Sequence, residues 1–288
     1  MFKLVFLGTS SSTPSVQRSL PSVALVREGE VFLFDCGEGT QRQMLKYGIS
    51  YAKVRAIFLS HLHLDHTLGA FGLAETIKLN LREKIIDVYG PKGTSGLFHN
   101  RPQVRVHEFS GAQTIDMGDF TMQVAQNNHM PNGSFSFAAC EKPKVRFHKD
   151  KAKFLGLKGP QFTEIKEKGK LKINGKTIKL KEITYVQEGK KITYSGDTSF
   201  CPALAKLARG SHVLIHEATF SKEDALLAKE HMHSTSIDAA QAAKKSSSQL
   251  LLLTHISSRY PPNLLEEEAK AIFPNTTAAY DGFSLEVK

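Results

Sequence analysis

Four residues of types that commonly bind metal ions lie within the six positions of the sequence HLHLDH. His61 and His63 follow the apolar run VRAIFLS, and residues two apart on extended backbone point the same way, so these imidazoles can bind one ion together. The turn that follows carries Asp65 and His66 in another direction, where a carboxylate and an imidazole suit a second ion. This spacing favours a site for two metal ions over isolated structural histidines.

Further ligand-type side chains follow other short apolar runs. FTMQVAQNN leads to His129, KKITYSGD ends in Asp197, SHVLIHEAT contains His216 and Glu217, and SQLLLLTH ends in His255. Runs of this length bounded by turn signals are typical of buried strands, and helical patterns lie between several of them. Strands that alternate with helices predict an α/β fold. In such folds functional groups gather where strands end in loops, so these residues are expected to meet the HLHLDH cluster.

The composition is that of a globular protein with one strongly basic segment. The chain has 288 residues, of which 41% are hydrophobic, and no apolar run approaches the roughly 20 residues that cross a bilayer. The segment from Cys140 to Lys191 holds 16 basic and 6 acidic residues, which accounts for the whole net charge of +10. A block of this kind indicates a polyanionic partner such as nucleic acid. The three widely spaced cysteines argue against a disulfide framework and favour the cytoplasm.

The HxHxDH pattern is followed in order by a histidine, a GD pair after a strand and a TH pair after a strand. This order resembles the metallo-β-lactamase superfamily of binuclear metal hydrolases. The resemblance implies one catalytic domain over residues 1–288 with an αββα sandwich fold. It also implies two zinc ions per subunit, with manganese as an alternative. The implied ligands are His61, His63 and His129 for the first ion, Asp65, His66 and His255 for the second, and Asp197 as a bridge between them.

His107 and His148 are alternatives to His129, because the sequence around His129 has little pattern. Asp35 in FDCGEGT also matches the superfamily, and it is expected to support a metal ligand rather than to bind the ion itself.

Shorter motifs narrow the resemblance to one family. HEAT at His216–Thr219, HST at His233–Thr235, HISSRY and AYDG follow in order, and a Gly-Pro pair lies in the basic segment. Together they resemble the short form of the tRNase Z (ribonuclease Z) family, endoribonucleases that remove the 3′ trailer from precursor tRNA and leave a 3′-hydroxyl. The departing ribose 3′-oxygen needs a proton, since an alkoxide is a poor leaving group. His233 is the expected acid, Glu217 would orient it, and Asp65 would help to deprotonate the attacking water.

The family resemblance also accounts for the basic segment. It implies that residues 141–190 form an inserted flexible arm, an exosite that protrudes from the sandwich and binds tRNA across a homodimer. Lysine contacts to phosphate would give affinity with little base readout. KLKINGKTIKLKEI predicts a hairpin with Asn174-Gly175 at its turn. The implied RNA-binding residues are Lys151, Lys153, Lys158, Gly159, Pro160 and, outside the arm, Arg18.

The loop around Arg18 departs from the family pattern. The family often carries Pro-x-Lys-x-Arg-Asn here, in a loop associated with rejecting precursors that already contain CCA. This chain has PSVQRS, in which Val16 replaces the lysine and Ser19 the asparagine. The sequence therefore leaves open whether CCA-containing precursors are rejected.

Two other functions remain open from the sequence. A metallo-β-lactamase-fold hydrolase of small esters would have the same ligands, because the metal site alone does not select the substrate. A nucleic-acid-binding protein with structural metal ions is the alternative that is not an enzyme. Structural zinc sites are usually closed by four ligands, often cysteines, so a His/Asp cluster without cysteine argues against this alternative.

Overall fold

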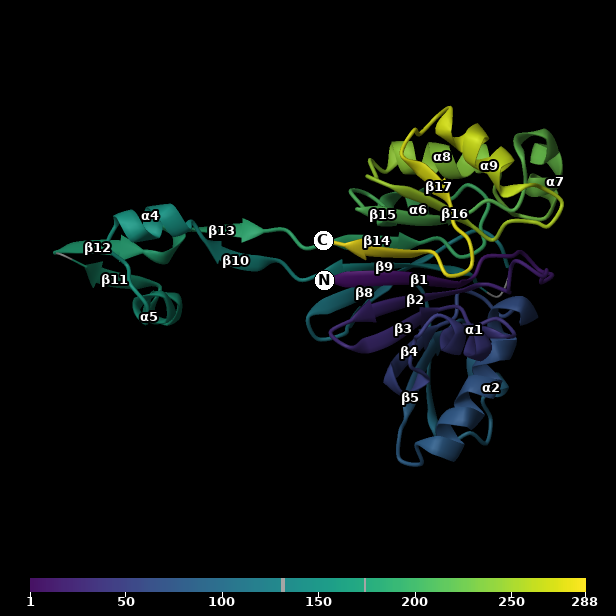
Figure 1. Ribbon diagram of the computed structural model, residues 1–288, viewed down its shortest axis with the longest axis horizontal. Helices are drawn as coiled ribbons and strands as arrows, with labels where there is room; N and C mark the ends of the chain where they lie inside the picture. Colours follow the sequence, from purple (N-terminus) through teal and green to yellow (C-terminus); the bar gives the residue numbers. More distant parts are fainter. Residues whose placement is uncertain (131–132, 174) are drawn as a thin grey trace. The chain divides into compact units, whose positions relative to one another are not determined.

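The computed structural model describes residues 1–130, 133–173 and 175–288, and these divide into two compact units. The first unit is Met1–Cys140 with Lys190–Lys288, and the second is Glu141–Gly189 (Figure 1). The second unit lies within the range expected for the inserted arm. Across the described ranges, no helix has both the length and the apolar character needed to cross a membrane.

The first unit contains two mixed sheets of seven strands each. In one sheet β3 to β6 run parallel, while β18, β1, β2 and β3 pair antiparallel. Its strands in spatial order are β18 (Ser284–Val287), β1 (Phe2–Gly8), β2 (Ser22–Arg27), β3 (Glu30–Phe34), β4 (Val54–Phe58), β5 (Ile86–Gly90) and β6 (Val104–Glu108).

In the other sheet β14 to β17 run parallel, and β9 pairs antiparallel with β14. Its strands in spatial order are β17 (Thr276–Ala278), β16 (Leu251–Thr254), β15 (Val213–Glu217), β14 (Lys191–Tyr194), β9 (Phe135–Glu141), β8 (Phe120–Gln126) and β7 (Gln113–Asp116).

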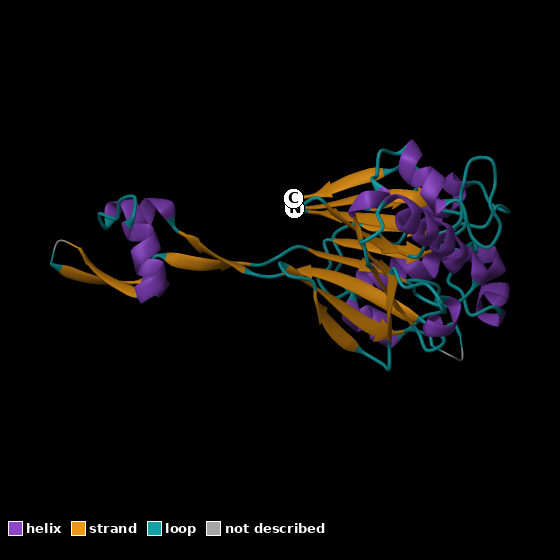
Figure 2. Ribbon diagram, turned by 90° about the horizontal axis from the view of Figure 1, so that it is seen from below, coloured by secondary structure: helices purple, strands orange, loops and turns teal. Residues whose placement is uncertain are grey.

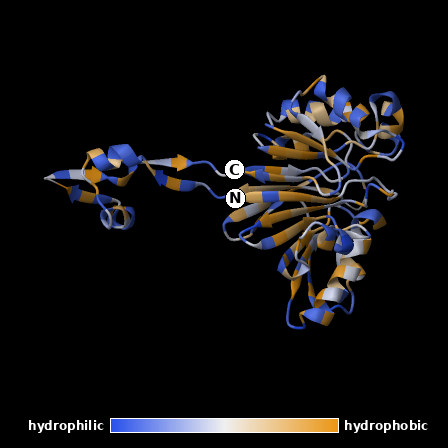
Figure 3. Cartoon of the chain, in the orientation of Figure 1, coloured by the Kyte–Doolittle hydropathy of each residue, from blue (hydrophilic) through white to orange (hydrophobic). Residues whose placement is uncertain are grey.

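Strands such as β1 are apolar on both faces. One face packs against the other sheet, and the opposite face packs against helices. Along β1, Phe2, Leu4 and Phe6 point into a core shared with the other sheet, where Phe120 packs edge-on against Phe2 at 5.5 Å between ring centres. The alternate residues Val5 and Leu7 point to the opposite face, where helices cover them. Figure 3 shows these hydrophobic strands in the middle of the first unit.

Helices cover the outer faces of both sheets (Figure 2). Leu73 and Ile77 of α2 pack in the core on one face, and Ala239 and Ala243 of α8 pack in the core on the other. The order of layers is therefore helix, sheet, sheet, helix, which confirms the expected αββα sandwich. The helices of this unit are α1 (Thr40–Lys46), α2 (Leu64–Asn80), α3 (Thr94–Leu97), α6 (Pro202–Leu207), α7 (Ala225–Glu230), α8 (Ser236–Lys245) and α9 (Pro262–Lys270), with short 3₁₀ turns at η1 (Tyr51–Lys53) and η3 (Lys222–Asp224).

The second unit has an apolar core of its own, formed by residues such as Ile165, Ile173 and Ile183. The predicted hairpin is confirmed as β11 paired with β12; Gly175 has φ +80°, and Asn174 lies outside the described residues. The elements are β10 (Lys144–Phe147), which pairs with β13 (Thr184–Gln187), α4 (Lys149–Phe154), α5 (Gln161–Lys168), β11 (Lys170–Ile173), β12 (Lys176–Lys179) and η2 (Leu180–Glu182).

Candidate metal centre

The seven expected ligands come together at one edge of the first unit. The ligand atoms of one group lie within 4.8 Å of one another, and so do those of a second group. The first group is His61, His63, His129 and Asp197, and the second is Asp65, His66 and His255. His61 and His63 follow β4, Asp65 and His66 begin α2, His129 follows β8, Asp197 follows β14, and His255 follows β16. Strand ends therefore supply the site, as the sequence pattern indicated.

The Asp197 carboxylate connects the two groups. Its Oδ2 lies 3.2 Å from Nε2 of His66, 3.2 Å from Nε2 of His255 and 3.7 Å from Nε2 of His61. Its Oδ1 is buried and has no hydrogen-bond partner among the residues that the structure describes. Burial raises the pKa of Asp197, but the surrounding imidazoles lower it by more, and the pKa falls well below the ordinary value. An ionised, buried oxygen without a donor fits a bound cation.

A glycine allows Asp197 to reach this position. Gly196 has φ +60°, a conformation that side chains rarely adopt. A Cβ atom there would lie 2.7 Å from Cβ of Ser60 and 2.9 Å from the backbone oxygen of Phe135. The glycine of the GD pair is thus required by the close approach of Ser60, which follows β4, and of Phe135 in β9.

Four of the expected ligand histidines use Nδ1 for a hydrogen-bonding contact and turn Nε2 toward Asp197. His61 contacts Ser60 Oγ at 3.0 Å, His129 contacts the Met232 oxygen at 3.0 Å, and His255 contacts Thr219 Oγ1 at 2.8 Å. His66 contacts Asp35 Oδ2 at 2.8 Å. These partners hold each ring in the orientation that a metal ligand needs.

His63 differs from these four residues, because it turns Nδ1 and not Nε2 toward the neighbouring rings. Its Nδ1 lies 2.9 Å from Nε2 of His61 and 3.3 Å from Nε2 of His129. Three imidazole nitrogens therefore point at one place. Burial lowers the pKa of all three rings, which keeps them in the neutral form that binds metal.

Asp35 supports the second group without binding in it. Its Oδ1 accepts from the Ser60 backbone N–H at 2.7 Å, and its Oδ2 accepts from Ser60 Oγ at 2.8 Å and from Tyr194 OH at 2.7 Å, in addition to the His66 contact. Its backbone has φ +56°, which turns the side chain beneath His66 at the end of β3. The expected supporting role for Asp35 agrees with these contacts.

Replacing Asp35 with asparagine is expected to weaken zinc binding by about 10–100-fold, because the amide cannot accept all of these hydrogen bonds and the His66 ring loses its fixed orientation. A competition titration against a chelating dye measures the affinity. Asp87→Asn is the matched control, since Asp87 contacts His107 at 2.8 Å outside the metal groups. An unchanged zinc affinity in a folded Asp35→Asn variant would show that this carboxylate does not position His66.

The two alternatives to His129 lie elsewhere. His107 is on β6, where its ring stacks on Tyr89 at 4.4 Å between centres. His148 precedes α4 in the second unit. Within the described ranges neither residue belongs to a metal-binding group. The structure therefore places His129, and not these two, with the other expected ligands.

His233 and Glu217 form a pair beside the metal groups. His233 Nδ1 lies 2.8 Å from Glu217 Oε1, and the buried carboxylate also accepts from the Thr198 N–H at 2.7 Å and from Thr219 Oγ1 at 2.6 Å. Burial lowers the pKa of His233, but the Glu217 carboxylate raises it by more, to about 9. An imidazolium held in this way is a proton donor at neutral pH.

The His233 side chain lines a cavity of about 370 Å³ that also borders the metal groups at His63 and His129. Ser11 to Thr13 and Ser257 to Arg259 form other parts of its wall. A substrate in this cavity would contact His233 and the metal groups together.

No role for Thr219 follows from the sequence, although Thr219 is part of the HEAT motif. Its hydroxyl lies 2.6 Å from Glu217, 3.3 Å from His233 Nδ1 and 2.8 Å from His255 Nδ1. The hydroxyl therefore connects the expected acid, His233, to His255, an expected metal ligand. The motif was the available signal, but the sequence does not show which side chains the hydroxyl meets.

Among the expected RNA-binding residues, Arg18 turns its side chain toward the protein and bonds to Thr9 and Ala279. Its guanidinium donates to Thr9 Oγ1 at 2.6 Å and to the Ala279 oxygen at 2.9 Å, and burial lowers its pKa. These contacts hold the N-terminal loop, and RNA binding by Arg18 stays a prediction. The other expected residues, Lys151, Lys153, Lys158, Gly159 and Pro160, are exposed in the second unit.

The chain is similar to known proteins over most or all of its length. Residues 30–256 match the family model described as Beta-lactamase superfamily domain. Ribonuclease Z of Methanothermobacter thermautotrophicus is 39% identical over 302 residues, which cover 100% of this chain and 97% of that protein.

Two solved structures are similar to this chain over nearly their whole length. The short form of human tRNase Z, ELAC1, is 29% identical with a TM-score of 0.72, and the match covers 99% of each chain. The metallo-beta-lactamase fold protein YhfI from Bacillus subtilis has a TM-score of 0.75 at 18% identity, covering 99% of this chain and 98% of that one, and supports the fold alone. On the strength of the full-length match to Ribonuclease Z, this chain belongs to the Ribonuclease Z family of the beta-lactamase superfamily.

Proposed function

We propose that this chain removes the 3′ trailer from precursor tRNA at the site described above, with two divalent metal ions and with His233 as the general acid. Membership of the Ribonuclease Z family makes the chain a tRNA 3′-processing endoribonuclease. The observation that carries the residue assignment is the His233–Glu217 pair beside two adjacent groups of His and Asp ligands. Hydrolysis of a phosphodiester with a ribose leaving group needs both parts.

The donor set fits two divalent ions. It consists of imidazole nitrogens and carboxylate oxygens, which suits zinc and also accommodates manganese. His61, His63 and His129 would hold one ion, Asp65, His66 and His255 the other, and Asp197 would bind both. When bound, such a pair supplies a nucleophilic hydroxide at neutral pH and neutralises charge on the phosphate.

The side chains of the site divide the proton transfers between them. Glu217 occupies Nδ1 of His233, so Nε2 is the nitrogen left to protonate the ribose 3′-oxygen of the tRNA. Asp65 is ionised, because burial raises its pKa less than the contact with His255 and the other imidazoles lower it, to about 2. The backbone N–H of Ser12 donates to Asp65 Oδ2 at 3.1 Å, which fixes this carboxylate where it can accept a proton from water. The tRNA keeps a 3′-hydroxyl, and the phosphate stays on the trailer.

The second unit is proposed to bind the tRNA through its phosphates. Its exposed Lys151, Lys153 and Lys158 suit phosphate contacts, and Gly159 and Pro160 stand directly before α5. The proposal includes a cytoplasmic homodimer in which the arm of one subunit serves the active site of the other. Contacts to phosphate rather than to bases suit an enzyme that accepts many tRNAs.

A single-turnover assay tests the function directly. The wild-type chain with zinc or manganese is expected to cut a precursor tRNA once, at the end of the tRNA, and to leave a 3′-hydroxyl. The Asp65→Ala and His233→Ala variants serve as controls, and a second precursor with an encoded CCA tests discrimination. Hydrolysis of a small phosphodiester without cleavage of either precursor would overturn the tRNA assignment in favour of a small-ester hydrolase.

Removing the arm is expected to reduce precursor cleavage by roughly 10²-fold or more, because the phosphate contacts that supply affinity are lost. Cys140 and Lys191 are cross-strand partners in β9 and β14, so an Asn-Gly turn can replace residues 141–190 without disturbing the sheet. Hydrolysis of bis-p-nitrophenyl phosphate by the same protein should stay within about twofold of wild type, since that substrate is too small to need phosphate contacts away from the metal groups. Full precursor cleavage by the shortened protein would contradict the role given to the arm.

A further inference from the structure

The expected ligands come from both sheets of the first unit. His66 lies in α2, which follows β4 of one sheet, whereas Asp197 follows β14 of the other (Figure 1). Nε2 of His66 nevertheless lies 3.2 Å from Oδ2 of Asp197. Metal–ligand distances vary by only about 0.2 Å, so a site divided between two sheets needs contacts that fix one sheet against the other.

The Tyr194 hydroxyl makes such a contact. Tyr194 ends β14, and its OH lies 2.7 Å from Oδ2 of Asp35, which follows β3 in the other sheet. Burial and the Asp35 carboxylate raise the pKa of Tyr194 well above its ordinary value, so the hydroxyl keeps its proton and donates the bond. The same Oδ2 atom lies 2.8 Å from Nδ1 of His66. One oxygen of Asp35 therefore joins the strand that precedes Asp197 to an expected ligand on the opposite side of the sandwich.

The other donors to Asp35 come from its own sheet. Asp35 is fully buried, and it accepts from the backbone N–H and the hydroxyl of Ser60, which follows β4. A buried carboxylate is stable only where donors surround it. Among the described residues, the Tyr194 hydroxyl is the donor to Asp35 that comes from the other sheet. A backbone bond of 2.9 Å from the Phe135 N–H to the Ser60 oxygen also crosses between the sheets, but it does not reach His66.

Ring packing holds Tyr194 in place independently of its hydroxyl. The ring stacks on Phe34 at 5.3 Å between centres, with 6° between the two planes. Tyr194 is 2% exposed and belongs to the apolar core that the two sheets share. A phenylalanine at this position would keep these contacts, because it has the same ring. The Tyr194→Phe substitution therefore removes the hydrogen bond to Asp35 and leaves the packing.

We propose that Tyr194 is a positioning residue for the second group of metal ligands. Its hydroxyl holds Asp35 beneath His66, and Asp35 holds Nδ1 of His66, so that Nε2 of this ring stays directed at the place beside Asp197. The hydroxyl thus sets the position of a ligand from one sheet relative to a ligand from the other. This inference rests on the two metal ions of the proposed function and not on the RNA.

Zinc binding by the full-length Tyr194→Phe protein tests the role. In a competition titration with a chelating dye, one of the two zinc ions should be held about tenfold more weakly than in wild type, which is the lower end of the usual effect of a residue that supports a metal ligand. The other ion should keep its wild-type affinity. Tyr89→Phe is the matched control, because the Tyr89 ring packs against the same core and its hydroxyl makes no hydrogen bond among the described residues.

A double-mutant cycle separates this role from a general loss of packing. If the hydroxyl acts through Asp35, Tyr194→Phe should change zinc affinity by less than about twofold in the Asp35→Asn background. Equal losses in both backgrounds would overturn the positioning role. The single variant also decides by itself: an unchanged zinc affinity, or equal weakening of both ions, would overturn the proposal.

The same titration distinguishes this inference from the proposed function. A wild type that binds no zinc would overturn both. A wild type that binds two ions and does not cut precursor tRNA would overturn the function alone, because the zinc titration of Tyr194→Phe needs no RNA.

Discussion

The rate at which the Asp197→Asn variant cleaves precursor tRNA is expected to fall roughly 10³-fold or more below that of wild type. The substitution keeps the shape of the side chain and removes its negative charge. Oδ2 of Asp197 lies 3.2 Å from Nε2 of His66 and 3.2 Å from Nε2 of His255, and Oδ1 has no hydrogen-bond donor among the described residues. Asp65 Oδ2 also lies 3.5 Å from Nε2 of His66 and 3.7 Å from Nε2 of His255, but both of these belong to the second group. Asp197 Oδ2 lies 3.7 Å from Nε2 of His61 in the first group as well, so its loss should leave the two ions without a shared ligand.

Metal content and thermal stability test this expectation independently of activity. A ligand that binds only the folded state raises the melting temperature, so zinc should stabilise the wild type and should stabilise Asp197→Asn much less. Asp87→Asn again serves as the control, with the wild-type response to zinc. A variant that keeps two bound ions and the wild-type rate would exclude Asp197 as the bridge between the groups.

The His233→Gln variant is expected to lose about 10²–10⁴-fold in the rate of precursor cleavage, which is the usual contribution of a general acid. The effect should fall on the chemical step, because His233 Nδ1 pairs with Glu217 and His233 is not one of the seven expected ligands, although its ring lies within 4.8 Å of ligand atoms of Asp197 and His255. Zinc content and tRNA affinity should therefore stay close to wild type. Single-turnover cleavage with saturating enzyme measures the chemical step alone.

The leaving group separates this role from a structural one. A p-nitrophenolate departs without a proton, so His233→Gln should hydrolyse bis-p-nitrophenyl phosphate far better than it cleaves RNA, each relative to wild type. His231→Gln is the matched control, because His231 lines the same cavity and is not part of the Glu217 pair. Equal losses on both substrates would mean that His233 supports the metal site and does not protonate the leaving oxygen.

Much of the metal centre could be predicted because its residues are local in sequence or stand at recognisable strand ends. HLHLDH places four expected ligands within six positions, and Asp197 and His255 closely follow apolar runs. His129 was the exception, because the residues between it and β9 carry no clear period. Its placement depends on the hydrogen-bonding contact with Met232, which is 103 positions away in the chain.

The arm shows the same division between local pattern and packing. The hairpin of β11 and β12 could be predicted from its alternation and its glycine turn. The two phenylalanines near Gly159 could not be distinguished by sequence. In the structure Phe162 packs against Phe147 at 5.0 Å between ring centres, while Phe154 is 90% exposed. Which ring enters the small apolar core depends on how α4 and α5 pack against the hairpin.

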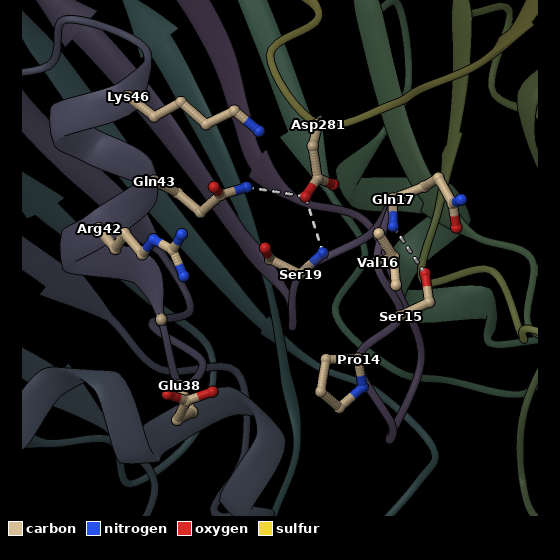
Figure 4. Close-up of a pocket in the computed structure, with 11 residues that line it drawn as sticks. Pro14, Ser15, Val16, Gln17, Ser19, Glu38, Arg42, Gln43, Lys46 and Asp281 are labelled. Carbon is tan, nitrogen blue, oxygen red and sulfur yellow. Dashed lines mark hydrogen bonds between the residues drawn. The ribbon is translucent and has the colours of Figure 1, made fainter.

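The sequence by itself determined the α/β class, the ligand types of the metal centre and the basic segment, because these follow from local period, residue chemistry and charge count. Only the tertiary structure decided that Arg18 turns inward to Thr9, that Thr219 joins Glu217 to His255, and that the Pro14–Ser19 loop and α1 line one cavity (Figure 4). Each of these depends on side chains from segments far apart in the chain. Their contacts are set by the packing of one layer on another, for which a single sequence contains no periodic signal.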